Sequence, residues 1–169
     1  GAEFLIQKQL DQFNFWFNFS LMNNTYDFST FTPQQFANNF KITQSSSFGL
    51  TYSSEQLQVS VGGRYFAGRP TTEIDLNNPI LTPETNPRPN FLSPNESNLQ
   101  DYLQVNLTSS YQFEFSASRL KTGLSILNVF NSSNLTQQFY RLEDSGVSVE
   151  SVKVRSLEFT PNLFIALEF

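Results

Sequence analysis

The residues from 103 to 115 alternate strictly between two chemical classes. Polar side chains occupy every even position, and apolar or aromatic side chains occupy every odd position except Ser109. A period of two sends successive side chains to opposite faces of a β-strand, whereas a helix would scatter the apolar residues around its cylinder. The run is longer than the usual soluble strand of about 5 to 6 residues. It meets the roughly 9 to 11 residues that a tilted strand needs to cross a bilayer.

The same alternation recurs at 13–21, at 57–67 and at the end of the chain. One face of such a strand meets hydrocarbon in a transmembrane β-barrel, and the other meets a polar lumen. By the same parity, Trp16, Arg64, Glu114 and Glu168 are expected to point inward. The residues predicted to face lipid are Phe13, Phe15, Phe17, Phe19, Leu57, Val59, Val61, Leu103, Val105 and Leu107.

The composition agrees with a barrel and excludes several functions. Mean hydropathy is -0.32, although the 169 residues include 19 phenylalanines, because lumen-facing residues offset lipid-facing ones. The formal net charge of -5 argues against a nucleic-acid partner. The chain has no histidine and no cysteine, so it lacks the commonest metal ligands and the usual general base. We therefore expect no enzyme activity, no cofactor and no metal site.

Seven strands are predicted, and short and long connectors alternate between them. The predicted strands cover residues 2–10, 13–22, 40–52, 57–67, 102–115, 120–130 and 152–169. Short turns on one rim and long loops on the other are the pattern of outer-membrane barrels. With the C-terminus in the periplasm, every long loop lies outside the cell. Single-chain bacterial barrels have an even number of strands, so residues 1–169 are predicted to be the C-terminal portion of a larger barrel.

Several segments resemble the closing strands of TonB-dependent outer-membrane transporters, in chain order and over almost the whole chain. They are 1–4 (GAEF), 36–39 (FANN), 123–131 (GLSILNVFN), 140–142 (YRL) and 157–163 (LEFTPNL). The histidine that often follows the position of Asn39 in that family is absent here. The resemblance implies an all-β, antiparallel transmembrane barrel of 22 strands filled by an N-terminal plug. The plug and the earlier strands would lie outside this chain.

The resemblance also implies a function and a set of partners. The protein would take up a scarce ligand, namely an iron chelate, cobalamin, a glycan or a peptide, across the outer membrane of a Gram-negative bacterium. Its partners would be the other strands and the plug of the same protein, outer-membrane lipid, and the TonB energising complex acting through the missing N-terminal part. A surface lipoprotein is a further candidate partner.

Two features of the chain carry more specific expectations. The apolar positions of the last strand end on a phenylalanine, as in the assembly signal of outer-membrane barrels; they are Leu163, Ile165, Leu167 and Phe169. The stretch 69–100 contains six of the eight prolines and is a candidate ligand-binding loop, because loops beyond about 12 to 15 residues are often functional. Its charged residues include Asp75, Glu84, Arg88 and Glu96.

Two alternatives remain open at this stage. A small self-contained barrel, acting as a porin or an adhesin, would need an even number of strands, and two strands merged within 131–169 would supply it. A soluble β-sandwich would bury the same phenylalanines against a second sheet. The length of the alternating strands and the terminal phenylalanine favour the larger barrel.

Deleting Phe169 from the full-length protein tests the assembly signal. Little buried area is lost, so the purified variant should still refold in detergent, whereas its level in the outer membrane should fall. Immunoblots of membrane and periplasmic fractions measure this. Normal outer-membrane levels after the deletion, and after Leu167→Ser as well, would show that the ending is an ordinary strand.

Overall fold

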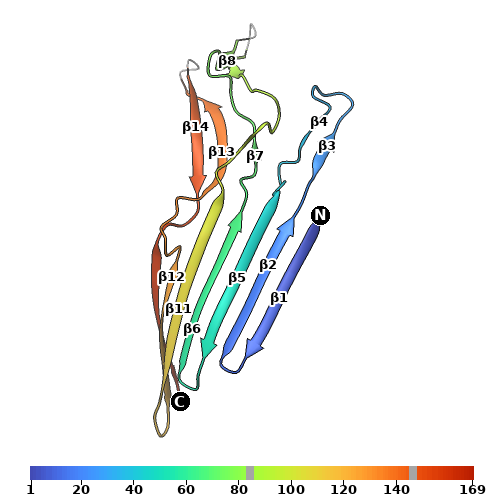
Figure 1. The fold of residues 1–169 in the computed structure, drawn as a ribbon. Coiled ribbons are helices and arrows are strands. Elements are labelled where there is room, and N and C mark those ends of the chain that lie inside the picture. Colours follow the sequence, from blue (N-terminus) through green and yellow to red (C-terminus); the bar gives the residue numbers. More distant parts are fainter. Residues whose placement is uncertain (83–85, 145–147) are drawn as a thin grey trace.

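A computed structural model describes residues 1–82, 86–144 and 148–169, and within them the chain is all-β (Figure 1). The predicted all-β, antiparallel class is confirmed. Glu84, one of the charged residues named in the candidate loop, lies outside the described residues.

Seven strands form one antiparallel sheet, and their spatial order follows the chain. They correspond to the seven predicted strands. The strands are β1 (Ala2–Leu10), β2 (Phe13–Leu21), β5 (Gln44–Ser53), β6 (Leu57–Phe66), β11 (Tyr102–Glu114), β12 (Arg119–Leu127) and β15 (Thr160–Glu168). The third begins later than the predicted residue 40, because Asn38 accepts hydrogen bonds from the N–H groups of Phe40 and Lys41 and forms a turn there.

The prediction of a single strand over 152–169 is wrong. Strand β14 (Val149–Arg155) pairs with β13 (Leu135–Leu142) in a separate hairpin, and β15 begins only at Thr160. Loop acceptors interrupt the strand: Ser156 N–H donates to the Asn134 carbonyl at 2.9 Å, and Phe159 N–H donates to Asn131 Oδ1 at 2.9 Å. Because β14 does not join the main sheet, the sheet keeps seven strands.

The other two long connectors also contain short two-stranded ribbons. These are β3 (Thr25–Asp27) with β4 (Gln35–Ala37), β7 (Pro70–Thr71) with β10 (Ser97–Asn98), and β8 (Ile80–Leu81) with β9 (Arg88–Pro89). All the ribbons lie at one end of the sheet, which we call the loop end (Figure 1). The three tight turns and the C-terminus lie at the opposite end, the turn end (Figure 1). The predicted separation of short and long connectors is therefore confirmed.

Cross-strand pairing gathers the alternating apolar residues of all seven strands on one face, which we call the apolar face. Phe17 pairs with Ile6 on one side and Phe48 on the other, and Leu163 pairs with Leu124. Besides the predicted lipid-facing residues, this face carries Phe4, Ile6, Leu10, Leu21, Phe48, Leu50, Leu120, Leu124, Leu163, Ile165 and Leu167.

Nothing in the described part of the chain covers the apolar face. Ile165 is 76% exposed and Phe13 is 49% exposed, and the only buried hydrophobic side chains among the described residues are Ile74 and Tyr102. The sheet therefore has no hydrophobic core of its own. Exposed apolar area of this extent marks a surface that meets lipid or another protein.

The opposite, polar face carries Trp16, as its even position in the alternating strand predicts. Its indole occupies the space that a Cβ would need at Gly49, the residue paired with it on β5. The ring of Phe164 covers Gly123 in the same way across β12 and β15. Glycine at these two positions lets a large ring lie flat on the neighbouring strand.

Asn128 connects the end of β12 to the start of β15. It is fully buried, and its side-chain amide donates to the carbonyls of Ser132 at 2.9 Å and Leu157 at 3.1 Å. Its Oδ1 accepts from Ser132 N–H at 3.0 Å. Asn128 adopts a φ of 54°, a left-handed conformation that asparagine tolerates better than most residues. This one side chain thus holds the loop in the shape from which β15 enters the sheet.

Replacing Asn128 with glycine should destabilise the protein. Glycine keeps the left-handed backbone but removes the side-chain hydrogen bonds to Ser132 and Leu157, each worth about 0.5 to 1.5 kcal/mol. Denaturant titration of the purified protein, followed by the fluorescence of Trp16, measures the free energy of unfolding. The control is Asn24→Gly at an exposed position. Equal losses in the two variants would contradict the role of the buried amide.

Candidate functional site

The structure places all the predicted lipid-facing residues on the apolar face, and the assembly-signal residues of β15 join them. Leu163, Ile165 and Leu167 pair with Leu124, Thr122 and Leu120 of β12. Phe169 lies beyond the end of β15 and is 98% exposed. Contact of this face with lipid and recognition of the last strand during assembly stay predictions.

The inward-facing charges do not gather at one place. Arg64 lies toward the loop end, where its Nη2 donates to Tyr102 Oη at 3.0 Å and to Gln104 Oε1 at 2.9 Å. Its guanidinium also stacks over the Tyr102 ring, 5.0 Å from the ring centre. Glu114 and Glu168 lie at the turn end, where both pair in register with Arg119. The structure thus does not bring Arg64 together with the two glutamates.

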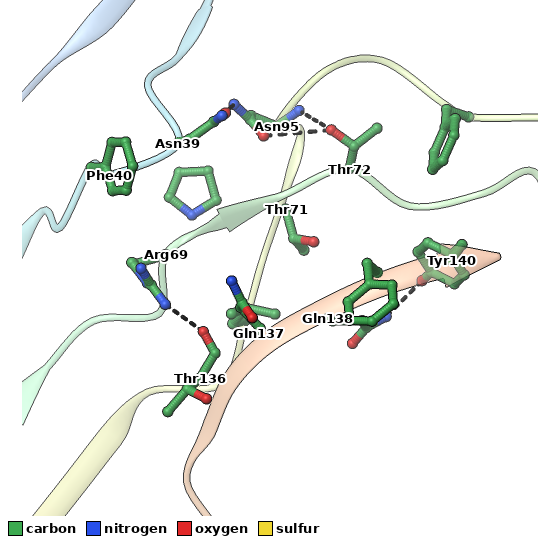
Figure 2. Close-up of a pocket in the computed structure, with 14 residues that line it drawn as sticks. Asn39, Phe40, Arg69, Thr71, Thr72, Asn95, Thr136, Gln137, Gln138 and Tyr140 are labelled. Atoms are coloured by element: carbon green, nitrogen blue, oxygen red, sulfur yellow. Dashed lines mark hydrogen bonds between the residues drawn. The ribbon is translucent and has the colours of Figure 1, made fainter. Parts of the chain in front are cut away.

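The loop end of the sheet contains a pocket of about 440 Å³, drawn in Figure 2. All three long connectors contribute to it: residues 39–40, residues 69–72 with 91–99, and residues 136–140 of β13. Three phenylalanines line it, Phe40, Phe91 and Phe139. Its neutral polar lining consists chiefly of Asn39, Thr71, Thr72, Gln137, Gln138 and Tyr140.

Asn95 links the first long connector to the second. Its side-chain amide donates to the Ala37 carbonyl at 2.7 Å and to Asn39 Oδ1 at 2.5 Å. Asn39 and Asn95 lie side by side in Figure 2. Its backbone N–H donates to Thr72 Oγ1 at 3.0 Å. Asn95 adopts a φ of 55°, which directs the amide across the gap between the two connectors.

Arg69 links the second long connector to the third. One of its guanidinium nitrogens donates to the backbone carbonyl of Thr136 at the start of β13 (Figure 2). No acidic residue lines the pocket among the described residues, and none lies within salt-bridge distance of Arg69 there. Among the described residues, this positive charge makes its one hydrogen bond to a neutral carbonyl.

Asp101 joins the two ends of the second long connector. Its carboxylate accepts a hydrogen bond from Tyr65 Oη at 2.6 Å and another from Gly68 N–H at 3.0 Å. These two donors, the tyrosine first, lower the pKa of the Asp101 carboxyl below its ordinary value. The bonds hold the end of β6 against the start of β11, and the connector leaves the sheet from this fixed point.

The candidate ligand loop 69–100 does contribute to the pocket, but its charged residues named from the sequence do not. Asp75, Arg88 and Glu96 are absent from the lining, and Asp75 instead accepts from Asn77 N–H at 2.9 Å. Arg69 and Asn95 lie within this predicted loop, but neither was predicted individually as a site residue. The signal in the sequence for a role of Arg69 was its position next to Pro70, two residues after the predicted strand 57–67.

Comparisons of the chain with protein-family models, with curated proteins and with solved structures gave no match. In the part of the chain that the structure describes, no helix is long and apolar enough to cross a membrane. The same residues contain no group of three or more acidic side chains that could hold a metal ion.

Replacing Asn95 with glycine should release the first connector from the second. Glycine accommodates the left-handed φ, so the loss is confined to the side-chain hydrogen bonds. Hydrogen exchange measured by mass spectrometry should accelerate at residues 36–41 and stay unchanged in β2 and β5. The control is Gln137→Ala, which removes an amide of the pocket that makes no side-chain hydrogen bond among the described residues. Unchanged exchange at 36–41 in the Asn95 variant would refute the link.

Proposed function

We propose that residues 1–169 form the closing strands of the β-barrel of a TonB-dependent receptor, which takes up a scarce ligand across the outer membrane of a Gram-negative bacterium. The observation that carries the proposal is the apolar face, which extends from β1 to β15 and has no cover within the described chain. Lipid is the surrounding that can cover such a face while the other face stays polar.

The dimensions of the sheet support a membrane setting. A nine-residue strand such as β2 rises roughly 30 Å at about 3.3 Å per residue. At the tilt of about 40° found in outer-membrane barrels, it spans roughly 23 Å along the membrane normal, close to the apolar band of about 25 Å in such barrels.

Aromatic residues at the turn end of the apolar face give further support. The rings of Phe13 and Tyr52 lie 5.1 Å apart, and those of Tyr111 and Phe113 lie 4.7 Å apart. The Tyr111 hydroxyl reaches past the sheet and donates to Gln56 Oε1 in the β5–β6 turn at 2.6 Å. Aromatic rings with an apolar body and a polar tip are enriched at membrane interfaces.

The direction of the edge strands argues that these seven strands do not close into a barrel by themselves. Seven alternating strands leave β1 and β15 running in the same direction, so joining these two edges directly would be parallel. Antiparallel closure requires an odd number of additional strands. A 22-stranded barrel would supply fifteen, which is 22 minus the seven of this sheet.

Arginine at two adjacent positions of β2 tests the proposal. Phe17 is the central residue of β2 on the apolar face, and Asn18 is next to it on the polar face. In the full-length protein, Phe17→Arg should cost about 2 to 4 kcal/mol, as expected for arginine at a bilayer midplane, and Asn18→Arg should be nearly neutral. Denaturant titration in lipid vesicles and outer-membrane levels in cells both measure the difference. Equal tolerance at the two positions would argue against a bilayer contact.

A further inference from the structure

The loop-end pocket is positively charged in an acidic chain. The formal net charge of the protein is -5, yet the one charged residue of the described lining is Arg69. A guanidinium has five N–H donors, and the structure assigns one hydrogen bond to Arg69, to the Thr136 carbonyl. The remaining donors are available to a ligand, and carboxylate is a group that arginine binds with two parallel hydrogen bonds.

The rest of the lining combines flat apolar surfaces with neutral hydrogen-bonding groups. Phe40 is 69% exposed, Phe91 is 51% exposed and Phe139 is 47% exposed, so their rings are open to a ligand. Amides and hydroxyls line the pocket together with the rings. The apolar C–H faces of a sugar ring can lie on an aromatic ring, while its hydroxyl groups bond to neutral amides, which both donate and accept.

We propose that this pocket binds a saccharide that carries a carboxylate, with Arg69 holding the acid group and the aromatic rings supporting the sugar. The inference rests on the proposed function, because it names the class of ligand that the receptor would capture at its outer end. The links made by Arg69 and Asn95 shape the pocket before any ligand binds, so binding requires little rearrangement of the three connectors.

Calorimetric titration of the purified full-length protein with matched ligands tests the inference. The probes are a panel of acidic oligosaccharides, including trigalacturonate, triglucuronate and sialyllactose, each paired with its uncharged methyl ester. Triglutamate serves as an acidic peptide. At least one acid should bind roughly tenfold or more tightly than its ester, as expected for hydrogen bonds to a charged group. Absence of binding by every acid, equal binding of acid and ester, or tighter binding of triglutamate would overturn the inference.

Variants separate the charge of Arg69 from its role as a link. Arg69→Gln should abolish the preference for the acid, and Arg69→Lys should retain part of it. Asn95→Gly loosens the pocket without removing the charge, so it should weaken acid and ester by the same factor. Phe91→Ala should weaken both ligands, whereas Phe31→Ala, at an exposed ring outside the pocket, should weaken neither. A preference for the acid that survives Arg69→Gln would overturn the assignment.

Fractionation of the same cells keeps this inference separate from the proposed function. A wild-type protein that reaches the outer membrane but binds no acid of the panel would refute the pocket assignment alone. A protein that binds the acid through Arg69 but is absent from the outer membrane would refute the proposed location and leave the pocket assignment standing.

Discussion

The uncovered apolar face of the sheet is the constraint on which the rest of this structure depends. Hydrophobic stabilisation is proportional to apolar area removed from water, and the described chain removes little of it between its own elements. Ile165 and Leu163, both more than three-quarters exposed, lie on the same face as the half-exposed Phe13. The stability of such a sheet depends on an apolar surface, of lipid or of protein, that covers this face.

At the loop end, hydrogen bonds of buried side-chain amides stabilise the connectors together with the packing of Ile74 and Tyr102. Asn134 is buried and pairs with both backbone groups of Leu103, accepting from its N–H at 2.9 Å and donating to its carbonyl at 2.8 Å. Asn128 bonds to the backbone of Leu157 at the far end of its own connector, and Asn95 bonds to the backbone of Ala37 in the first connector. An amide offers a donor and an acceptor on one short side chain, which suits irregular backbone that has no strand partner.

These side-chain links connect the sheet to the pocket. On the polar face, Arg64 binds Gln104, which donates to Asn106 Oδ1, and the same oxygen accepts from the N–H of Asn128. Arg69 and Asn95 then join the three connectors to one another above the sheet. The strands from which the connectors start therefore set the position of the pocket, and polar contacts between the loops set its shape.

The sequence by itself determined the strands and their faces. The alternation along 13–21 and 103–115 predicted β2 and β11 and the side of the sheet on which each residue lies, because a period of two is a local property of the backbone. The lengths of the connectors predicted which end of the sheet carries the loops. The same reasoning placed Trp16 on the polar face, although it could not foresee that its ring would lie on Gly49.

Only the tertiary structure decided how the connectors fold and which residues meet in the pocket. The hairpin of β13 and β14 interrupts what reads locally as one long strand, because Asn134 and Asn131 accept hydrogen bonds from the N–H groups of Ser156 and Phe159. Arg69 contacts Thr136, and Asn95 contacts Ala37, at sequence separations of 67 and 58 residues. Such contacts depend on the pairing of strands far apart in the chain, and no periodic pattern in the sequence predicts them.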